Sequence, residues 1–305
     1  GNIIINEAVL DTIDMPEARK FSRYFLLQKR IAQIKSWIKA CDDNDGRVHG
    51  RVMTLKTITG RMSHNSPNMA QIPAVRSPYG KECRDCWTVE DTSTHSIVGT
   101  DASGLELRCL AHYMNDTTFT DILLTGDIHT HNMKMAGLTD RDQAKTFIYA
   151  FMYGAGAAKI GKIVGEGAKE GQRLIDNFLS SMTALKRVRD GVTKASAKGK
   201  IKGIDGRLLH IRSAHSALNT LLQGAGAFVC KIWLINIMTR VRTLGLDAKL
   251  VASIHDEYQF EVLNTDVKKF GQITKDAMKD TEKELHMKCP LDSEWKVGKT
   301  WAETH

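Results

Sequence analysis

The chain has 305 residues, of which 42% are hydrophobic and 26% are charged, and its formal net charge is +8. This length excludes a miniature fold and allows one large domain or two ordinary ones, while the balanced composition excludes a disordered or fibrous chain. The excess of basic residues suits a polyanionic partner such as nucleic acid, but it equally fits a basic surface that keeps a protein in solution.

The cysteines and the apolar stretches indicate the cellular compartment of the protein. Six cysteines are too few for a disulfide framework and the start lacks signal-peptide features, so we expect a cytoplasmic protein. Cys83 and Cys86 form a C-x-x-C pair, but no second pair follows at zinc-finger spacing, and a structural zinc needs four ligands. The most apolar stretch, 221–238, is interrupted by polar residues such as Gln223 and Lys231, which predicts a buried helix and no membrane span.

The first part of the chain predicts a helix followed by strands and a loop. In 17–40, apolar residues recur at three- and four-residue spacing with basic residues between them, as in one long amphipathic helix. Residues 47–59 alternate and are rich in β-branched side chains, which predicts strands that end at Gly60. Three prolines within 67–78 then exclude a regular helix and predict an ordered loop.

Two carboxylates interrupt segments that otherwise predict buried strands. Residues 97–100 predict a short buried strand and 105–114 a helix, with Asp101 at the exit of the strand. In 250–262 apolar residues alternate with other residues, so the apolar side chains would share one face of a strand. Asp256 interrupts this pattern where a hairpin would turn. Taken singly, each is more often a turn or cap residue, but a carboxylate near a core needs a cation or a cleft, so the two invite a shared divalent ion.

The middle of the chain is predominantly helical. Residues 139–153 predict a helix with Thr139 as its N-cap and Asp142 in a capping box. Residues 166–200 predict a further, Lys- and Arg-rich helical region, followed by a turn and short strands near 208–211, and 217–243 predicts the apolar helix.

A charged stripe lies on the helix predicted for 139–153. Arg141, Lys145 and Tyr149 are four residues apart and therefore share one face. Two cations and a ring could bind a triphosphate and its base, although a solvated basic face is the commoner meaning of such a stripe. His129 is equally ambiguous, because a lone histidine is usually not a ligand.

Three strings resemble the motifs of a known family. DASGLELR begins at Asp101, RDQAKTFIYAFMYG at Arg141 and HDE at His255, and in this order they resemble motifs A, B and C of family A, DNA polymerase I-like, DNA polymerases. The similarity extends to GRMSHNSPNMAQIP from Gly60, to DGRLLHIRSAHSALNTLLQ from Asp205 and to the closing KVGKTW. It covers nearly the whole chain and is most marked toward the replicative polymerases of short-tailed phages.

The resemblance implies an α+β right-hand polymerase fold, in which an antiparallel palm sheet is backed by helices. It implies a thumb base in 1–42, a palm in 43–115 and 217–305, and helical fingers in 116–216. The implied activity is template-directed addition of dNTPs to a primer 3′-hydroxyl, with release of pyrophosphate. The family's exonuclease domain and long thumb usually precede this region, so we expect no proofreading site in this chain.

The resemblance also assigns the catalytic residues. Asp101 and Asp256 would hold two Mg²⁺ ions, with the backbone carbonyl of Ala102 as a further ligand, and the ions would activate the 3′-hydroxyl and stabilise the leaving pyrophosphate. Around the nucleotide, the resemblance assigns phosphate contacts to His129, Arg141 and Lys145, the last of these also catalytic, and packing against the sugar and base to Tyr149.

Further assignments concern sugar selection and the DNA. Glu106 would clash with a ribose 2′-hydroxyl, and a Tyr rather than a Phe at position 149 implies weak discrimination against dideoxynucleotides. Arg61 and Gln223 would check base-pair shape in the minor groove, where acceptor positions are nearly the same for every correct pair. The remaining DNA contacts that the resemblance implies are His255 and Glu257 at the primer end, Tyr153 beside the templating base, and His215.

The implied partners are primer-template DNA and dNTPs, with a separate exonuclease or thumb subunit or a processivity factor if the polymerase is split, and no membrane. The setting would be the cytoplasm, that of the bacterial host if the protein is viral. Two alternatives stay open. One is a DNA-binding subunit that keeps the fold but needs its missing half for useful activity, and the other is a metal-dependent nuclease, which leaves the stripe that contains Arg141 unexplained.

Overall fold

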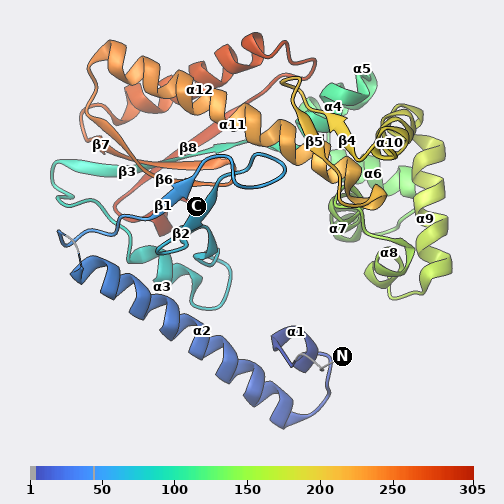
Figure 1. The fold of residues 1–305 in the computed structure, drawn as a ribbon, viewed down its shortest axis with the longest axis horizontal. Coiled ribbons are helices and arrows are strands. Elements are labelled where there is room, and N and C mark those ends of the chain that lie inside the picture. Colours follow the sequence, from blue (N-terminus) through green and yellow to red (C-terminus); the bar gives the residue numbers. More distant parts are fainter. Residues whose placement is uncertain (1–4, 44) are drawn as a thin grey trace.

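The computed structural model describes residues 5–43 and 45–305 and has an α+β architecture (Figure 1). A four-stranded antiparallel sheet in the order β6-β7-β3-β8 forms its centre. Its strands are β3 (His95–Ala102), β6 (Ala248–Ile254), β7 (Glu257–Leu263) and β8 (Ser293–Gly298). Two long helices, α11 (Ala217–Leu244) and α12 (Val267–Glu284), cover one face of this sheet.

The sheet forms because β3 supplies apolar side chains to a face that helices cover. Val98 lies opposite Phe260 of β7 and Val297 of β8, and the Phe260 ring packs 4.8 Å from that of Phe270 on α12. Val98 and Phe260 are fully buried. The strand predicted for 97–100 is therefore confirmed, and it is longer than predicted because both of its neighbours continue the ladder.

The hairpin predicted for 250–262 is confirmed, but its strict alternation is not. A bulge between Leu250 and Ala252 inserts Val251 into β6, which shifts the register of the strand. Leu250 lies opposite Phe260 as predicted, but after the bulge Ala252 lies opposite Gln259, so the prediction that Ala252 shares the face of Phe260 is wrong. Strand β7 is buried on both faces, and it includes the polar residue Gln259.

Helix α11 is a core helix, as its interrupted apolar pattern predicts. Trp233 is fully buried and donates a hydrogen bond from Nε1 to the carbonyl of Thr274 on α12 at 2.8 Å. The Tyr258 hydroxyl donates to the carbonyl of Cys230 at 2.8 Å and ties β7 to the same helix. By length and composition alone the helical segment 214–244 could cross a membrane, and 56% of its most apolar window is buried inside the protein.

Seven helices lie toward one end of the sheet (Figure 1). They are α4 (Leu105–Met114), α5 (Thr117–Thr125), α6 (Ile128–Ala136), α7 (Arg141–Met152), α8 (Ala157–Ile163), α9 (Ala168–Ser181) and α10 (Thr183–Ser196). Phe147 and Phe151 on α7 pack against Phe178 on α9, with ring centroids 5.1 and 5.5 Å from it. This contact buries one face of α7 and leaves the face with Arg141 and Lys145 exposed.

Two helix boundaries differ from the prediction. The N-cap of α7 is Asp140, whose carboxylate accepts from the Gln143 backbone N–H at 2.7 Å, so the capping box of Thr139 and Asp142 is wrong. Thr and Asp are both good caps, and sequence alone does not choose between neighbours. The single helical region predicted for 166–200 is two helices, because the backbone of Met182 leaves the helical conformation between them.

The N-terminal part contains α1 (Glu7–Leu10) and α2 (Pro16–Asp42), which lie on the side of the sheet opposite α11 and α12 (Figure 1). The long helix is confirmed, but its amphipathic pattern is wrong. At about 100° per residue Phe25 and Ile34 point to opposite sides, and both are exposed. Trp37 is buried, in a small cluster with Ile72 and Trp301, and anchors the end of α2.

The remaining elements are short. They are β1 (Arg51–Met53) with β2 (Ser63–Asn65), β4 (Lys200–Lys202) with β5 (Leu208–His210), α3 (Gly80–Asp85), η1 (Met69–Gln71), η2 (Ala214–Ser216) and η3 (Trp301–Thr304). The strands predicted for 47–59 are thus limited to 51–53. Turns fill 54–59, where the Lys231 ammonium group donates to the carbonyls of Thr54 and Gly60 at 2.6 and 2.7 Å.

Candidate active site

Strand register brings Asp101 and Asp256 together. Asp101 lies near the end of β3 directly opposite Glu257, the first residue of β7, and Asp256 precedes Glu257 in the hairpin. The backbone N–H of Ala102 donates to the carbonyl of Asp256 at 3.1 Å. Asp256, in the turn before β7, therefore lies beside the end of β3 that carries Asp101.

The surroundings of Asp101 disfavour its charged form. Partial loss of hydration raises the pKa of its carboxyl to about 7, and the negative charges of Asp256 and Glu257 act in the same direction. Glu294, opposite Asp101 on β8, adds to this effect, and Lys296 on the same strand opposes it. A carboxylate that is repelled by neighbouring negative charges and is still accessible to solvent is well suited to bind a cation.

The loop after β3 is fixed by a second set of contacts. The backbone N–H of Ser103 donates to the carbonyl of Asp292 at 3.0 Å, and Arg108 Nε donates to the carbonyl of Ser103 at 2.7 Å. Arg108 Nη1 also donates to the carbonyl of Pro290. These bonds hold the backbone around Ala102, so its position depends on β8 and α4 as well as on β3.

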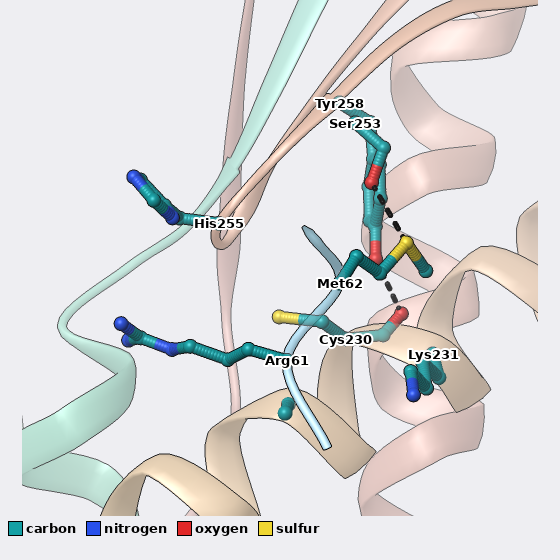
Figure 2. Close-up of a pocket in the computed structure, with 8 residues that line it drawn as sticks. Arg61, Met62, Cys230, Lys231, Ser253, His255 and Tyr258 are labelled. Carbon is teal, nitrogen blue, oxygen red and sulfur yellow. Dashed lines mark hydrogen bonds between the residues drawn. The ribbon is translucent and has the colours of Figure 1, made fainter. Parts of the chain in front are cut away.

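A small pocket lies beside the hairpin that carries Asp256. Figure 2 shows Arg61 and His255 on one side of it and Lys231 on the other. His255 is exposed and has φ of +58°, a left-handed conformation that turns its side chain away from the sheet. Two of the predicted DNA contacts, Arg61 and His255, thus lie close to one another.

Glu106 joins two elements that are far apart in sequence. Its carboxylate is 3.4 Å from Arg61 Nη2 and accepts a hydrogen bond from the Tyr153 hydroxyl at 2.8 Å. Burial and the Glu106 carboxylate both raise the pKa of Tyr153, so its hydroxyl stays protonated as the donor. The residue predicted to select the sugar is therefore in contact with two residues predicted to touch DNA.

The stripe on α7 has the predicted order. Arg141 and Lys145 are exposed, and Tyr149 is partly buried with its ring 6.4 Å from that of His129 and 6.5 Å from that of Tyr153. Burial raises the pKa of the Tyr149 hydroxyl, and the carboxylates of Glu106 and Asp256 contribute. The inner end of the stripe therefore faces the carboxylates, and its outer end carries the cations.

His129 lies beside this stripe, on the first turn of α6. Partial burial lowers the pKa of its imidazole, and the charges of Arg141 and Lys145 lower it further, so the ring is neutral at neutral pH. Its Nδ1 is buried and has no hydrogen-bond partner among the described residues. A neutral imidazole can still donate one hydrogen bond to a phosphate.

Glu257 lies apart from the open side of the site. It is 8% exposed, accepts from Trp301 Nε1 at 2.7 Å and lies 2.9 Å from His305 Nε2. Burial alone would raise its pKa, but the contacts with His305 and Trp301 hold the pKa below its usual value. This enclosure argues against direct contact with DNA and for a role in holding the hairpin.

The last two predicted DNA contacts lie on α11 and in η2. Gln223 is partly buried on α11, and His215 is exposed in η2. The His215 carbonyl lies where a Cβ on Gly154 would come to 2.1 Å, and Gly154 has φ of +78°. Position 154 thus requires glycine, and the end of α7 packs tightly against η2.

The comparisons with known proteins agree with this geometry. The family model for DNA polymerase family A matches residues 1–303. The chain belongs to this family. It is 39% identical to the DNA-directed DNA polymerase of Enterobacteria phage T3 and 38% identical to that of Escherichia phage T7, with 100% of the chain aligned to 49% of each relative. The chain therefore spans about half the length of these curated relatives.

A solved structure has the same fold. It is the polymerase domain of Pol1 from M. smegmatis in complex with a DNA primer-template and dNTP, and it superposes with a TM-score of 0.85 over 100% of this chain and 57% of that one. At 21% identity this likeness establishes the fold alone. The expected right-hand fold of family A polymerases is thus confirmed.

Several residues of the candidate site escaped the sequence analysis. Asp127 contacts Arg141, Glu294 lies opposite Asp101, and the side chains of Trp301 and His305 enclose Glu257. Only Asp127 leaves a local signal, since Asp is a preferred residue immediately before the start of a helix. The others depend on strand register and packing.

The available protein ligands suit a metal ion that takes its remaining ligands from the substrate. In residues 5–43 and 45–305, no group of three or more His, Cys, Asp or Glu side chains is arranged to hold a metal by itself. Magnesium commonly binds through one or two carboxylates plus substrate phosphates, which is what Asp101 and Asp256 offer. Cys83 and Cys86 are free thiols, one buried and one exposed.

Proposed function

We propose that this chain catalyses template-directed DNA synthesis, adding dNTPs to a primer 3′-hydroxyl with release of pyrophosphate. The observation that carries the proposal is the adjacency of Asp101 and Asp256 in a family A polymerase fold. The activity of the related phage polymerases agrees with it, although they are about twice as long.

Asp101, Asp256 and the backbone carbonyl of Ala102 would hold two Mg²⁺ ions. When bound, these ions lower the pKa of the attacking hydroxyl and stabilise charge on the leaving phosphate. The raised pKa of Asp101 supports the assignment, because the carboxyl gains most from a cation where its own neighbours repel it.

The stripe on α7 would bind the incoming nucleotide. Arg141 and Lys145 would neutralise the triphosphate and His129 would donate a hydrogen bond to it. Tyr149, at the inner end of the stripe, would pack against the sugar and base, where Glu106 would exclude a 2′-hydroxyl. Lys145 is the one of these cations best suited to assist the leaving pyrophosphate, because among the described residues it has no carboxylate partner.

The primer-template would lie along the open side of the sheet. Arg61 and Gln223 would contact the minor groove, His255 would support the primer end, and Tyr153 would lie beside the templating base. His215 would also contact the DNA. Glu257 would act indirectly, by holding the hairpin that carries Asp256.

The palm, fingers and thumb of the polymerase fold would correspond to successive groups of helices and strands. Residues 43–115 and 217–305 would form the palm, which contains the sheet with α11 and α12, and 116–216 would form the fingers, which contain α5 to α10. Residues 1–42 would form the base of a thumb. A separate exonuclease or thumb subunit, or a processivity factor, would extend the grip on DNA, and the reaction would take place in the cytoplasm of a bacterial host if the protein is viral.

Primer extension with Mg²⁺, a labelled primer-template and all four dNTPs tests the proposal. Elongated products from the purified chain would support it. Duplex binding without extension would favour a DNA-binding subunit that requires its partner. Release of mononucleotides without dNTPs would favour a nuclease, and retention of a mismatched 3′ nucleotide would agree with our expectation that these residues do not proofread.

A further inference from the structure

A carboxylate with no role in the proposed mechanism contacts one of the proposed nucleotide-binding residues. Asp127 Oδ2 accepts a hydrogen bond from Arg141 Nε at 2.7 Å, and Oδ1 accepts from Arg141 Nη2 at 3.1 Å. A bidentate ion pair fixes the plane of a guanidinium group more narrowly than a single contact does. The orientation of Arg141 is therefore set by Asp127.

Asp127 is itself fixed by the start of α6. Its Oδ1 accepts from the backbone N–H groups of His129 and Thr130 at 3.1 and 3.3 Å, and its Oδ2 accepts from Thr130 Oγ1 at 2.8 Å. These bonds make Asp127 the N-cap of the helix that carries His129. One carboxylate thus couples the position of His129 to that of Arg141.

The ion pair leaves the other edge of Arg141 available. Asp127 occupies the edge formed by Nε and Nη2, and no acceptor for Nη1 is present in the described part of the chain. The remaining edge, formed by Nη1 and the second hydrogen of Nη2, has the two parallel donors that match two phosphate oxygens. Arg141 is half exposed, so an anion can reach this edge.

We propose that Asp127 is a positioning residue, which holds Arg141 with its Nη1 edge toward the triphosphate and thereby sets nucleotide affinity. The inference rests on the proposed function, since it requires Arg141 to bind a nucleotide. Asp127 does not touch the nucleotide, because its negative charge would repel the phosphates. Its effect on the nucleotide passes through Arg141.

Asp127→Asn tests this role, because asparagine keeps an oxygen for the helix cap while it removes the charge and one acceptor. Asp116→Asn is the matched control: Asp116 caps α5 by accepting from the Phe119 N–H at 3.0 Å, and it forms no ion pair with any described residue. The probe is the dNTP complementary to the template, bound at equilibrium to the complex of the protein with a dideoxy-terminated primer-template. Single-turnover incorporation on an ordinary primer gives the maximal rate separately.

We expect Asp127→Asn to raise the dNTP concentration at half saturation about tenfold, in line with the loss of a charge-assisted contact. The maximal rate should change less than about threefold, and primer-template affinity and melting temperature should match those of Asp116→Asn. In an Arg141→Ala background Asp127→Asn should add nothing further, because both changes remove the same contact.

Two results would overturn the inference alone. One is nucleotide affinity in Asp127→Asn equal to that of the wild-type chain, and the other is a double variant whose loss is the product of the two single losses. A wild-type complex that binds no dNTP would instead overturn the proposed function, and the inference with it.

Discussion

The two halves of the candidate site are held in place by different means. Asp101 and Asp256 are fixed by the backbone ladder between β3 and β7. Arg141 and His129 stand on helices and depend on side-chain contacts, above all with Asp127. Backbone pairing leaves the carboxylates little freedom, whereas the positions of Arg141 and His129 depend on contacts between side chains and helix starts. We therefore expect substitutions of the carboxylates on the sheet to abolish primer extension almost completely. Substitutions of the cations on the helices should reduce it only in part.

The largest effect should come from the carboxylates. Asp101→Ala or Asp256→Ala should lower primer extension by more than about a thousandfold, since loss of a single preorganised electrostatic group already costs about 10²–10³. Duplex affinity should stay within a few-fold, because it depends mainly on phosphate contacts. Single-turnover extension and a DNA titration measure both quantities. Asp121→Ala, which removes an exposed carboxylate on α5, is the control and should extend normally, and extension by either active-site alanine variant would break the comparison.

The sheet should also be sensitive to added volume. A Cβ on Gly99 would lie 2.6 Å from Gln259 Nε2 and 2.8 Å from Thr304 Cβ, so Gly99→Ala should destabilise the fold by about 1–3 kcal/mol. On the helical side, Gly191→Ala on α10 meets nothing within 4 Å and should stabilise the protein by about 0.5–1 kcal/mol. Urea unfolding measures both, and equal effects would contradict the claim that the sheet is the more rigid half.

Lys145→Ala should give a graded loss. We expect the dNTP concentration at half-maximal rate to rise about tenfold, equivalent to about 1.4 kcal/mol, because one of two cations is removed from the phosphates. DNA affinity should not change. Thr146→Ala, at the next exposed position of α7, is the control for helix stability. A loss of DNA affinity as large as the loss of nucleotide affinity would remove the proposed role of Lys145.

The smallest effect concerns pH. Because the pKa of Asp101 is raised to about 7, its contribution to stability is present at low pH and is lost as the pH rises from about 4 through 7. Without divalent ions, Asp101→Asn should therefore melt progressively higher than the wild type over this interval, with little difference at pH 4. Solvent screening keeps the effect small, and Mg²⁺ should reduce the difference at pH 8. Scanning calorimetry at several pH values measures these melting temperatures. A difference between the two proteins that does not depend on pH would contradict the raised pKa of Asp101.

The sequence predicts local structure well where one signal dominates. The buried strand before Asp101, the helix that follows it and the apolar helix α11 each depend on a continuous local pattern, and each is present. The errors arise where two local choices are nearly equal, as with Thr139 and Asp140 as caps, or where a bulge at Val251 breaks an alternating pattern.

The candidate site was predicted mainly from its resemblance to a family, and its supporting contacts were not predicted at all. Spacing does not indicate that Asp101 pairs with Glu257 on one side and Glu294 on the other, because strand register is a property of the folded sheet. The ion pair of Asp127 with Arg141 likewise joins two helix starts that meet only in three dimensions.

The most direct test of the central claim is a crystal structure of the chain with a dideoxy-terminated primer-template, the matching dNTP and Mn²⁺ in place of Mg²⁺. We predict two anomalous-scattering peaks about 3.5–4 Å apart, each in contact with the carboxylates of Asp101 and Asp256. Peaks bound elsewhere, or none between these two side chains, would contradict the account.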